Sequence, residues 1–137
     1  MSEGNVESLL RASKAASAGS TPGDRESFLS ILDPEIEWIA RGGPPDLQGR
    51  FHGIDGARDY YARWASAWEE WDWEIEDARE SDDLVVTHTW LTGRGRGSGI
   101  VLDMRIGQLW RFREGKVVRY EAFPTWKQAL EAAGLEE

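Results

Sequence analysis

The sequence predicts an α+β fold, in which a curved antiparallel sheet forms a cone and helices from the N-terminal half cover it. Apolar residues recur at helical spacing early in the chain, and at a spacing of two in four later segments joined by short turns. Consecutive strands with short turns form a meander, which needs a helical layer on one face. Residues 1–137 contain no linker or repeat, so we expect one domain with a deep interior pocket.

Two helices are expected before the first strand. Residues 3–18 carry apolar side chains three and four positions apart. Residues 25–32 follow a possible cap, Asp24, and end at the Asp33-Pro34 pair, because a residue before proline is pushed out of the helical region.

A strand, a loop and a third helix come next. Residues 35–40 alternate apolar and acidic side chains, which predicts a strand with one solvent-exposed face. Residues 41–53 are rich in Gly and Pro and predict a loop. Residues 54–70 predict a helix with an apolar stripe along Ala57, Tyr60 or Tyr61, Trp64 and Trp68.

The second half predicts four strands and a closing helix. The strands are expected at 71–79, 84–95, 99–113 and 116–123, and the helix at 125–134. The "GRGRGSG" segment lies between two of these strands, so it predicts a hairpin tip and not a phosphate-binding loop, which would open a helix.

Composition excludes several classes of function. With 16 Lys and Arg against 25 Asp and Glu, the net charge of −9 disfavours nucleic acid and anionic membranes as partners. There is no cysteine, and two His residues are too few for a three-His or two-His-carboxylate metal site, so no metal or cofactor is expected. The N-terminus lacks the basic start and apolar centre of a signal peptide, and a soluble cytoplasmic protein is expected.

Three segments carry a resemblance to a known family: "LDPEIEW", "FHGIDGARDYYARW" and "LWRFREGKVVRYEAF". Together with the order of elements, they resemble the SnoaL-like family of the nuclear transport factor 2-like superfamily. The resemblance implies a cone-shaped fold, a small apolar ligand in the cone and a homodimer formed through the outer sheet face. Relatives include polyketide cyclases, ketosteroid isomerase, limonene epoxide hydrolase and proteins without enzyme activity, so the fold implies a pocket and no particular reaction.

The last hairpin determines which side chains face the cone. A two-residue turn at Glu114-Gly115 would pair Arg113 with Lys116. In that register six residues share the inner face: Ile106, Gln108, Trp110, Arg119, Glu121 and Phe123. The opposite face would carry the apolar patch for a dimer, which consists of Leu109, Val118 and Tyr120.

Glu121 and His88 are the candidate catalytic residues. The resemblance implies an acidic residue on the last strand that points into the cone, and Glu121 falls there. It is either a general acid or base, or a satisfied polar group paired with Gln108 or an arginine. His88 either exchanges a proton with Glu121 or is a structural histidine. The Arg-x-Asp pair of the epoxide hydrolases is replaced here by His88 and Trp90, which counts against epoxide hydrolysis.

Eight Trp, three Tyr and four Phe predict an aromatic core or a pocket walled by rings. The first hypothesis is a cofactor-independent isomerase, cyclase or hydratase for a small apolar carbonyl compound. The second is a module that binds a small hydrophobic ligand, or a dimeric structural module. The candidate ligand-binding residues are Trp38, Tyr60, Tyr61, Trp64, Trp90, Met104, Ile106, Gln108, Trp110, Arg119 and Phe123.

Overall fold

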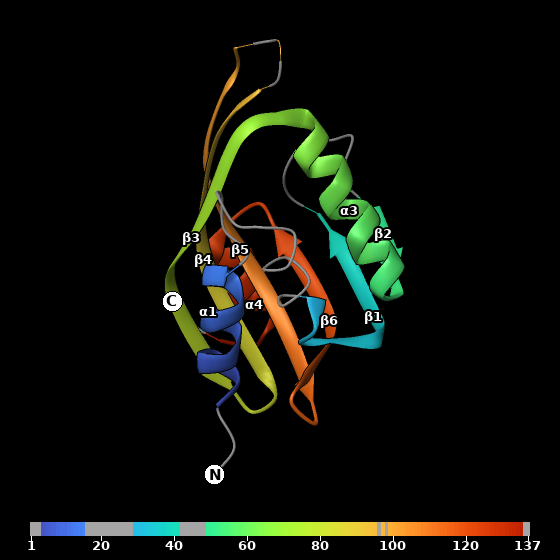
Figure 1. Ribbon diagram of the computed structural model, residues 1–137. Helices are drawn as coiled ribbons and strands as arrows, with labels where there is room; N and C mark the ends of the chain where they lie inside the picture. The colour runs from blue at the N-terminus through green and yellow to red at the C-terminus, as the bar shows by residue number, and fades with distance from the viewer. Residues whose placement is uncertain (1–3, 16–28, 42–48, 96, 98, 136–137) are drawn as a thin grey trace.

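Figure 1 shows the computed structural model, which describes residues 4–15, 29–41, 49–95, 97 and 99–135. Its elements are α1 (Asn5–Ala15), β1 (Leu32–Ala40), β2 (Gly49–His52), α3 (Gly53–Ala67), β3 (Trp68–Ser81), β4 (Leu84–Gly95), β5 (Val101–Arg113), β6 (Lys116–Phe123) and α4 (Trp126–Ala132). In this view α1 and α3 lie in front of the sheet and α4 lies behind it. The predicted α+β class is confirmed.

The six strands form one curled sheet in the order β2-β1-β6-β5-β4-β3. Strands β3 to β6 form the predicted antiparallel meander. The sheet as a whole is mixed, however, because β1 runs parallel to β6. This pairing joins strands that are distant in the sequence and closes the sheet around its inner face, which α1 and α3 cover (Figure 1).

The two faces of the sheet bury separate apolar clusters, and neighbouring residues in one strand supply both. Val85 belongs to the large inner cluster, which also contains Leu9 of α1 and Ala57 of α3. Val86 belongs to the outer cluster, where it packs against Ala129 and Leu130 of α4. Side chains therefore alternate between the faces as the pleat of a strand requires.

Helix α4 sits directly on the backbone of β5. A Cβ atom at Gly107 would lie 2.6 Å from the Ala129 Cβ and 2.6 Å from the Thr125 carbonyl oxygen. Thr125 caps this short helix, since its hydroxyl accepts a hydrogen bond from the Gln128 amide. Gly107 thus provides the close approach that lets α4 cover the outer face.

Several element boundaries differ from the prediction. Gly49–His52, predicted as loop, is the edge strand β2, which pairs with the end of β1. Trp68 is not helical but begins β3, because the long β3–β4 hairpin already pairs Trp68 with Gly95. Residues 25–28 of the helix expected at 25–32 lie outside the described residues. The described remainder is helical only at Leu29, forms a turn at Ser30 and Ile31, and enters β1 at Leu32.

The predicted register of the β5–β6 hairpin is correct only next to its turn. Arg113 pairs with Lys116 as expected, and Phe112 pairs with Val117. The next pair is Arg111 with Arg119, so Val118 is an extra residue in β6 and forms a bulge. Beyond a one-residue bulge, every later side chain changes face.

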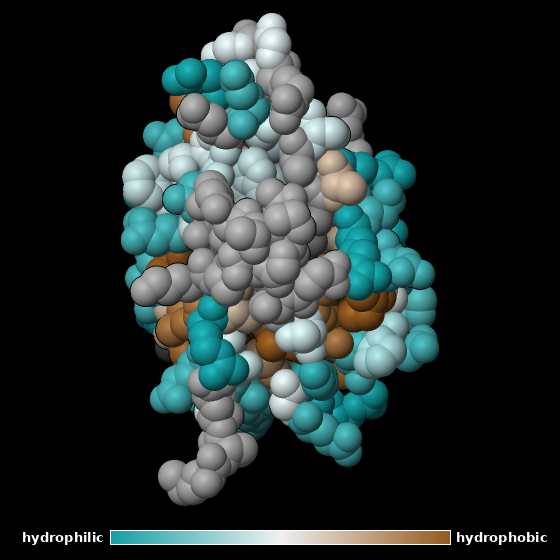
Figure 2. Space-filling model, in the orientation of Figure 1, coloured by the Kyte–Doolittle hydropathy of each residue, from teal (hydrophilic) through white to brown (hydrophobic). Residues whose placement is uncertain are grey.

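The surface seen in Figure 2, in the orientation of Figure 1, is mostly hydrophilic around its outline. Apolar residues reach this surface mainly in the lower half of the view. Among the described residues, no helix is long and apolar enough to cross a membrane.

Candidate ligand-binding site

A pocket opens into the inner side of the sheet, between α3 and strands β1 and β3 to β6. It encloses about 370 Å³, a volume that includes the part open to solvent. The enclosed part is far smaller, about 30 Å³, which is room for one or two waters, so a ligand would enter it from the open side. The lining residues are Trp38, Tyr60, Trp64, Trp71, Trp73, Leu91, Ile106, Gln108 and Tyr120.

Aromatic rings form most of the pocket wall and hold one another in place. The Trp38 ring stacks on Tyr120, with 4.0 Å between ring centroids, and is tilted against Tyr60. Trp71 meets Trp64 and Trp73 nearly at right angles. Stacked and edge-to-face contacts of this kind stabilise ring positions beyond their apolar burial. The walls are therefore flat and mostly apolar.

A chain of buried hydrogen bonds ends at the pocket. The Trp110 indole N–H donates to the Thr87 hydroxyl, at 3.0 Å. The hydroxyls of Thr87 and Thr89 both donate to the Gln108 side-chain oxygen, at 2.9 and 2.6 Å. The Gln108 amide nitrogen donates to the Tyr120 hydroxyl oxygen, at 2.8 Å. Of the residues joined by these hydrogen bonds, Gln108 and Tyr120 line the pocket.

The two tyrosines of the pocket keep their protons well into alkaline conditions. Burial raises the pKa of Tyr60 to about 12. Burial also raises the pKa of Tyr120 well above its ordinary value, because it outweighs the hydrogen bond from Gln108. Removing a phenol from water disfavours its anion. Both side chains are thus neutral hydrogen-bond groups at physiological pH.

The prediction that Glu121 faces the cone is wrong. Beyond the Val118 bulge, Glu121 pairs with Leu109 and not with Gln108, and it lies on the outer face of β6. There it lines a wide, open depression beside α4, together with Arg41 and Phe123. Ala122 pairs with Gln108 in its place, and the inward side chains of this part of β6 are those of Tyr120 and Ala122.

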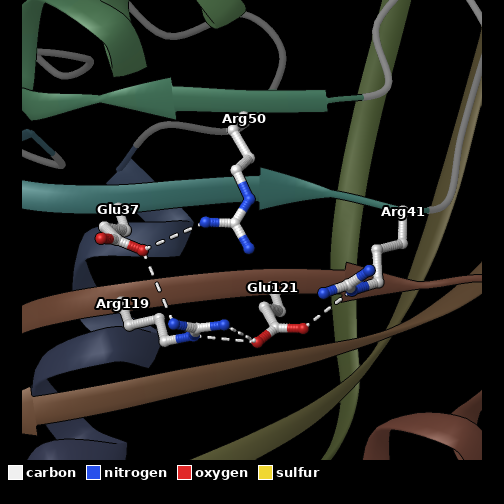
Figure 3. A network of polar contacts seen from close by, with 5 residues as sticks. All are labelled: Glu37, Arg41, Arg50, Arg119 and Glu121. Carbon is white, nitrogen blue, oxygen red and sulfur yellow. Dashed lines mark hydrogen bonds and ion pairs between the residues drawn. The ribbon is translucent and has the colours of Figure 1, made fainter.

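Glu121 is the centre of an ionic cluster on the outer face, drawn in Figure 3. Its carboxylate accepts hydrogen bonds from Arg41 at 3.0 Å and from Arg119 at 2.9 Å. Arg119 also reaches Glu37 at 3.5 Å, and Glu37 lies 4.0 Å from Arg50. Of the alternatives for Glu121, the geometry is that of a satisfied polar group, paired with arginines and not with Gln108.

The arginines keep the Glu121 carboxylate ionised. Its partial burial favours the neutral acid, but the hydrogen bonds and charges of Arg41 and Arg119 outweigh burial and lower the pKa of Glu121. A general acid at neutral pH needs the opposite shift, since its pKa should lie near the working pH. The carboxylate therefore forms ion pairs and does not have the raised pKa of a general acid.

His88 and Trp90 also lie on the outer face, where strand β4 alternates outward. The His88 ring stacks on Trp126 of α4, with 5.0 Å between centroids. The Trp90 indole N–H donates to Asp103 at 2.7 Å, and Arg105 lies over its ring. The predicted placement of His88 beside Glu121 in the cone is therefore wrong, and the structural reading of His88 holds.

The other predicted ligand-binding residues divide between the two faces. Five of them line the pocket: Trp38, Tyr60, Trp64, Ile106 and Gln108. Trp110 is buried behind it, and Met104 packs against the inner core without lining the pocket. Arg119 and Phe123 face outward because of the bulge. The Tyr61 side chain lies outside the described part of the chain.

Sequence reasoning missed Tyr120, which it assigned to the opposite face, as well as Thr87 and Thr89. The signal for the threonines was available, since Val85, Thr87, Thr89 and Leu91 share one face of β4. The predicted dimer patch is also wrong for two of its three members. Tyr120 faces inward, and Leu109 is already buried within the chain.

Comparison with protein families gives a match over most of the chain. The model of the SnoaL-like domain matches residues 14–120. No curated protein sequence gives a significant match.

Solved structures share the fold at low sequence identity. A nuclear transport factor 2-like protein of unknown function from Burkholderia pseudomallei is 19% identical, with a TM-score of 0.77, over 95% of this chain and 97% of that chain. TerC, crystallised with polyporic acid, is 22% identical, with a TM-score of 0.74, over 93% and 95%. A protein with a ketosteroid isomerase-like fold from Catenulispora acidiphila, in complex with trimethylamine, is 15% identical, with a TM-score of 0.70, over 99% and 96%.

Proposed function

The chain belongs to the SnoaL-like domain family, and from that premise we propose that it binds a small, flat, largely apolar molecule in the inner pocket. The observation that carries this proposal is the wall of six aromatic rings, four from Trp and two from Tyr, around a space open to solvent on one side. Such concave, aromatic surfaces with a few convergent polar groups are typical of small-molecule sites.

Binding is favoured over acid–base catalysis by the chemistry of the wall. Among the described residues that line the pocket, none carries a carboxyl, imidazole or amino group. Proton abstraction there would need Tyr60 or Tyr120 as a base, and burial raises the pKa of both. A neutral phenol polarises a carbonyl group but does not remove a proton at neutral pH. We therefore place isomerase, cyclase or hydratase activity second.

Structures of the same fold support a small ligand. One was crystallised with polyporic acid and another is a complex with trimethylamine. The fold thus accommodates compounds of different chemistry, and the side chains of this chain decide which one it takes. A homodimer stays a prediction from the family resemblance.

The proposal is tested with α-methylstyrene, a flat apolar probe, followed by NMR through the tryptophan indole N–H signals. We expect saturable shifts and a higher melting temperature, because a ligand that binds only the folded state stabilises it. Leu91→Phe places a larger ring in the pocket and should abolish the shifts.

Val101→Phe is the matched control, because Val101 is 72% exposed and lies outside the pocket. It should bind the probe like the parent protein. Binding that survives Leu91→Phe in a folded variant would place the probe elsewhere and contradict the proposal.

A further inference from the structure

Gln108 and Tyr120 place polar groups on the wall of the proposed pocket. The orientation of their hydrogen bonds gives the pocket a preference among ligands. We infer that the Tyr120 hydroxyl is a specificity-determining hydrogen-bond donor that selects ligands with an acceptor oxygen, such as a carbonyl, enol or phenolate oxygen. This inference rests on the proposed function and adds the class of ligand. It follows from the directions of the hydrogen bonds behind the pocket.

The series of hydrogen bonds begins at a group that can only donate. An indole N–H has no acceptor capacity, so the Thr87 oxygen must accept from Trp110. The Thr87 hydrogen then points to the Gln108 oxygen, which Thr89 approaches from a second side. With its oxygen held by two hydroxyls, the Gln108 amide must present its nitrogen to Tyr120.

Tyr120 consequently receives a hydrogen bond at its oxygen and directs its own hydrogen elsewhere. A phenol that accepts from an amide N–H can still donate one bond. The ring has little freedom to turn away, because it is 3% exposed and stacked on Trp38. Since both Tyr120 and Gln108 line the pocket, the chain delivers donor character to the place where a ligand would sit.

The same arrangement disfavours ligands that need an acceptor. The Gln108 oxygen already accepts two hydroxyls, and the Tyr120 oxygen accepts the Gln108 amide. A ligand N–H buried against these groups would lose its bond to water without regaining one, at a cost of about 1–3 kcal/mol. Burial also keeps Tyr120 protonated by raising its pKa, so the donor persists at physiological pH.

The test compares acetophenone with α-methylstyrene, which has the same shape but carries CH₂ in place of the carbonyl oxygen. We expect Tyr120→Phe to weaken acetophenone binding about fivefold to tenfold, as the loss of one hydrogen bond predicts, while α-methylstyrene changes less than about twofold. Both probes are measured with each variant, so the hydrocarbon controls for any change in pocket shape. Circular dichroism melting establishes that the variant is folded.

Thr87 is a positioning residue in this scheme, because it holds Gln108 and does not line the pocket. Thr87→Val should reduce the preference for acetophenone over α-methylstyrene, and Thr87→Ser should restore it. Thr92→Val is the matched control, since Thr92 lies on the outward side of the same strand and should leave the preference unchanged. A purely structural role of Thr87 would shift both probes together.

Three outcomes overturn the inference. One is an equal effect of Tyr120→Phe on both probes, or none on either, which would leave the proposed function standing. A second is tighter binding of the trimethylammonium ion than of acetophenone, since a cation favours the ring faces over hydroxyl donors. The third is no binding of either probe to the parent protein, which would remove the proposed function as well.

Discussion

At the scale of single residues, Glu121 shows how neighbouring charges determine the role of a carboxylate. It is held by two arginines, and its side chain is only 12% exposed. Loss of the charge would leave Arg41 and Arg119 without their shared partner, although both arginines are more open to water than the carboxylate. The residue therefore contributes to stability in a way that depends on pH.

We predict that Glu121→Gln lowers the free energy of unfolding by about 1 kcal/mol at neutral pH. The pKa of Glu121 is lowered in the folded state, so its contribution is present above the unfolded pKa of about 4.3 and is lost as pH falls through the folded pKa. The difference between parent and variant should thus shrink as pH falls below about 4.3. Urea unfolding at several pH values measures it.

Glu35→Gln is the control on the same side of the sheet. Glu35 pairs with His52 at 3.0 Å, but both side chains are largely exposed. Exposed pairs contribute little, so this variant should change stability by less than about 0.5 kcal/mol. Equal effects of the two substitutions would contradict the role assigned to the Glu121 cluster. Ligand binding should survive Glu121→Gln, since the residue lies outside the pocket.

At the scale of elements, the docking of α4 depends on a position without a side chain. We predict that Gly107→Ala destabilises the protein by about 1–3 kcal/mol, as overpacking does. The added Cβ would meet the Thr125 carbonyl and the Ala129 side chain at 2.6 Å, so the helix must shift. Thermal unfolding measures the loss, and the environment of Trp126 should change with it.

Gly4→Ala is the matched control for this substitution. A Cβ at Gly4 would have nothing within 4 Å, so its stability should stay close to that of the parent. An unchanged melting temperature for Gly107→Ala would show that α4 is not held by this close approach.

The bulge at Val118 is an element-scale feature with consequences for the site. Val117 is buried in the inner core, and so are Tyr120 and Ala122. Strict alternation cannot place both Val117 and Tyr120 on one face, because they are three residues apart. The extra residue resolves this conflict and moves Arg119 and Glu121 outward. Alternation counted from the turn without this bulge would place Arg119 and Glu121 on the inner face.

At the scale of the whole molecule, the core and the pocket are built from the same rings. Tyr60 of α3 and Tyr120 of β6 join the helical layer to the sheet, and both contact the buried Trp38. Ionisation of either phenol would put a charge inside this core. The alkaline stability of the entire fold therefore depends on these two residues.

We predict that stability falls as pH rises above about 10, the pKa of an unfolded tyrosine. The pKa of Tyr60 is about 12 in the folded state, and that of Tyr120 is also raised. The folded state then binds more protons than the unfolded state, so each step to higher pH favours unfolding. Tyrosinate absorbance and far-ultraviolet circular dichroism should change together, and Tyr120→Phe should reduce the alkaline loss. Ionisation of both residues near pH 10 in a protein that keeps native circular dichroism would contradict this.

The local patterns of the sequence determined most elements and the class of fold. Alternation placed β4 at 84–95 and β6 at 116–123, as observed. The aromatic content predicted the pocket walled by rings and three of its lining residues, Trp38, Tyr60 and Trp64. These features follow from spacing along one strand or helix, which the sequence displays directly.

Only the tertiary structure decided which carboxylates, imidazoles and phenols face the pocket. The parallel pairing of β1 with β6, the bulge at Val118 and the seating of α4 on Gly107 all join residues distant in the chain. A shift of one residue in the pairing of β6 exchanges Glu121 for Tyr120 on the inner face of the sheet, because strand side chains alternate with a period of two. An acidic proton-transfer site and a neutral hydrogen-bond donor thus differ by a single bulge, which packing of the whole sheet selects.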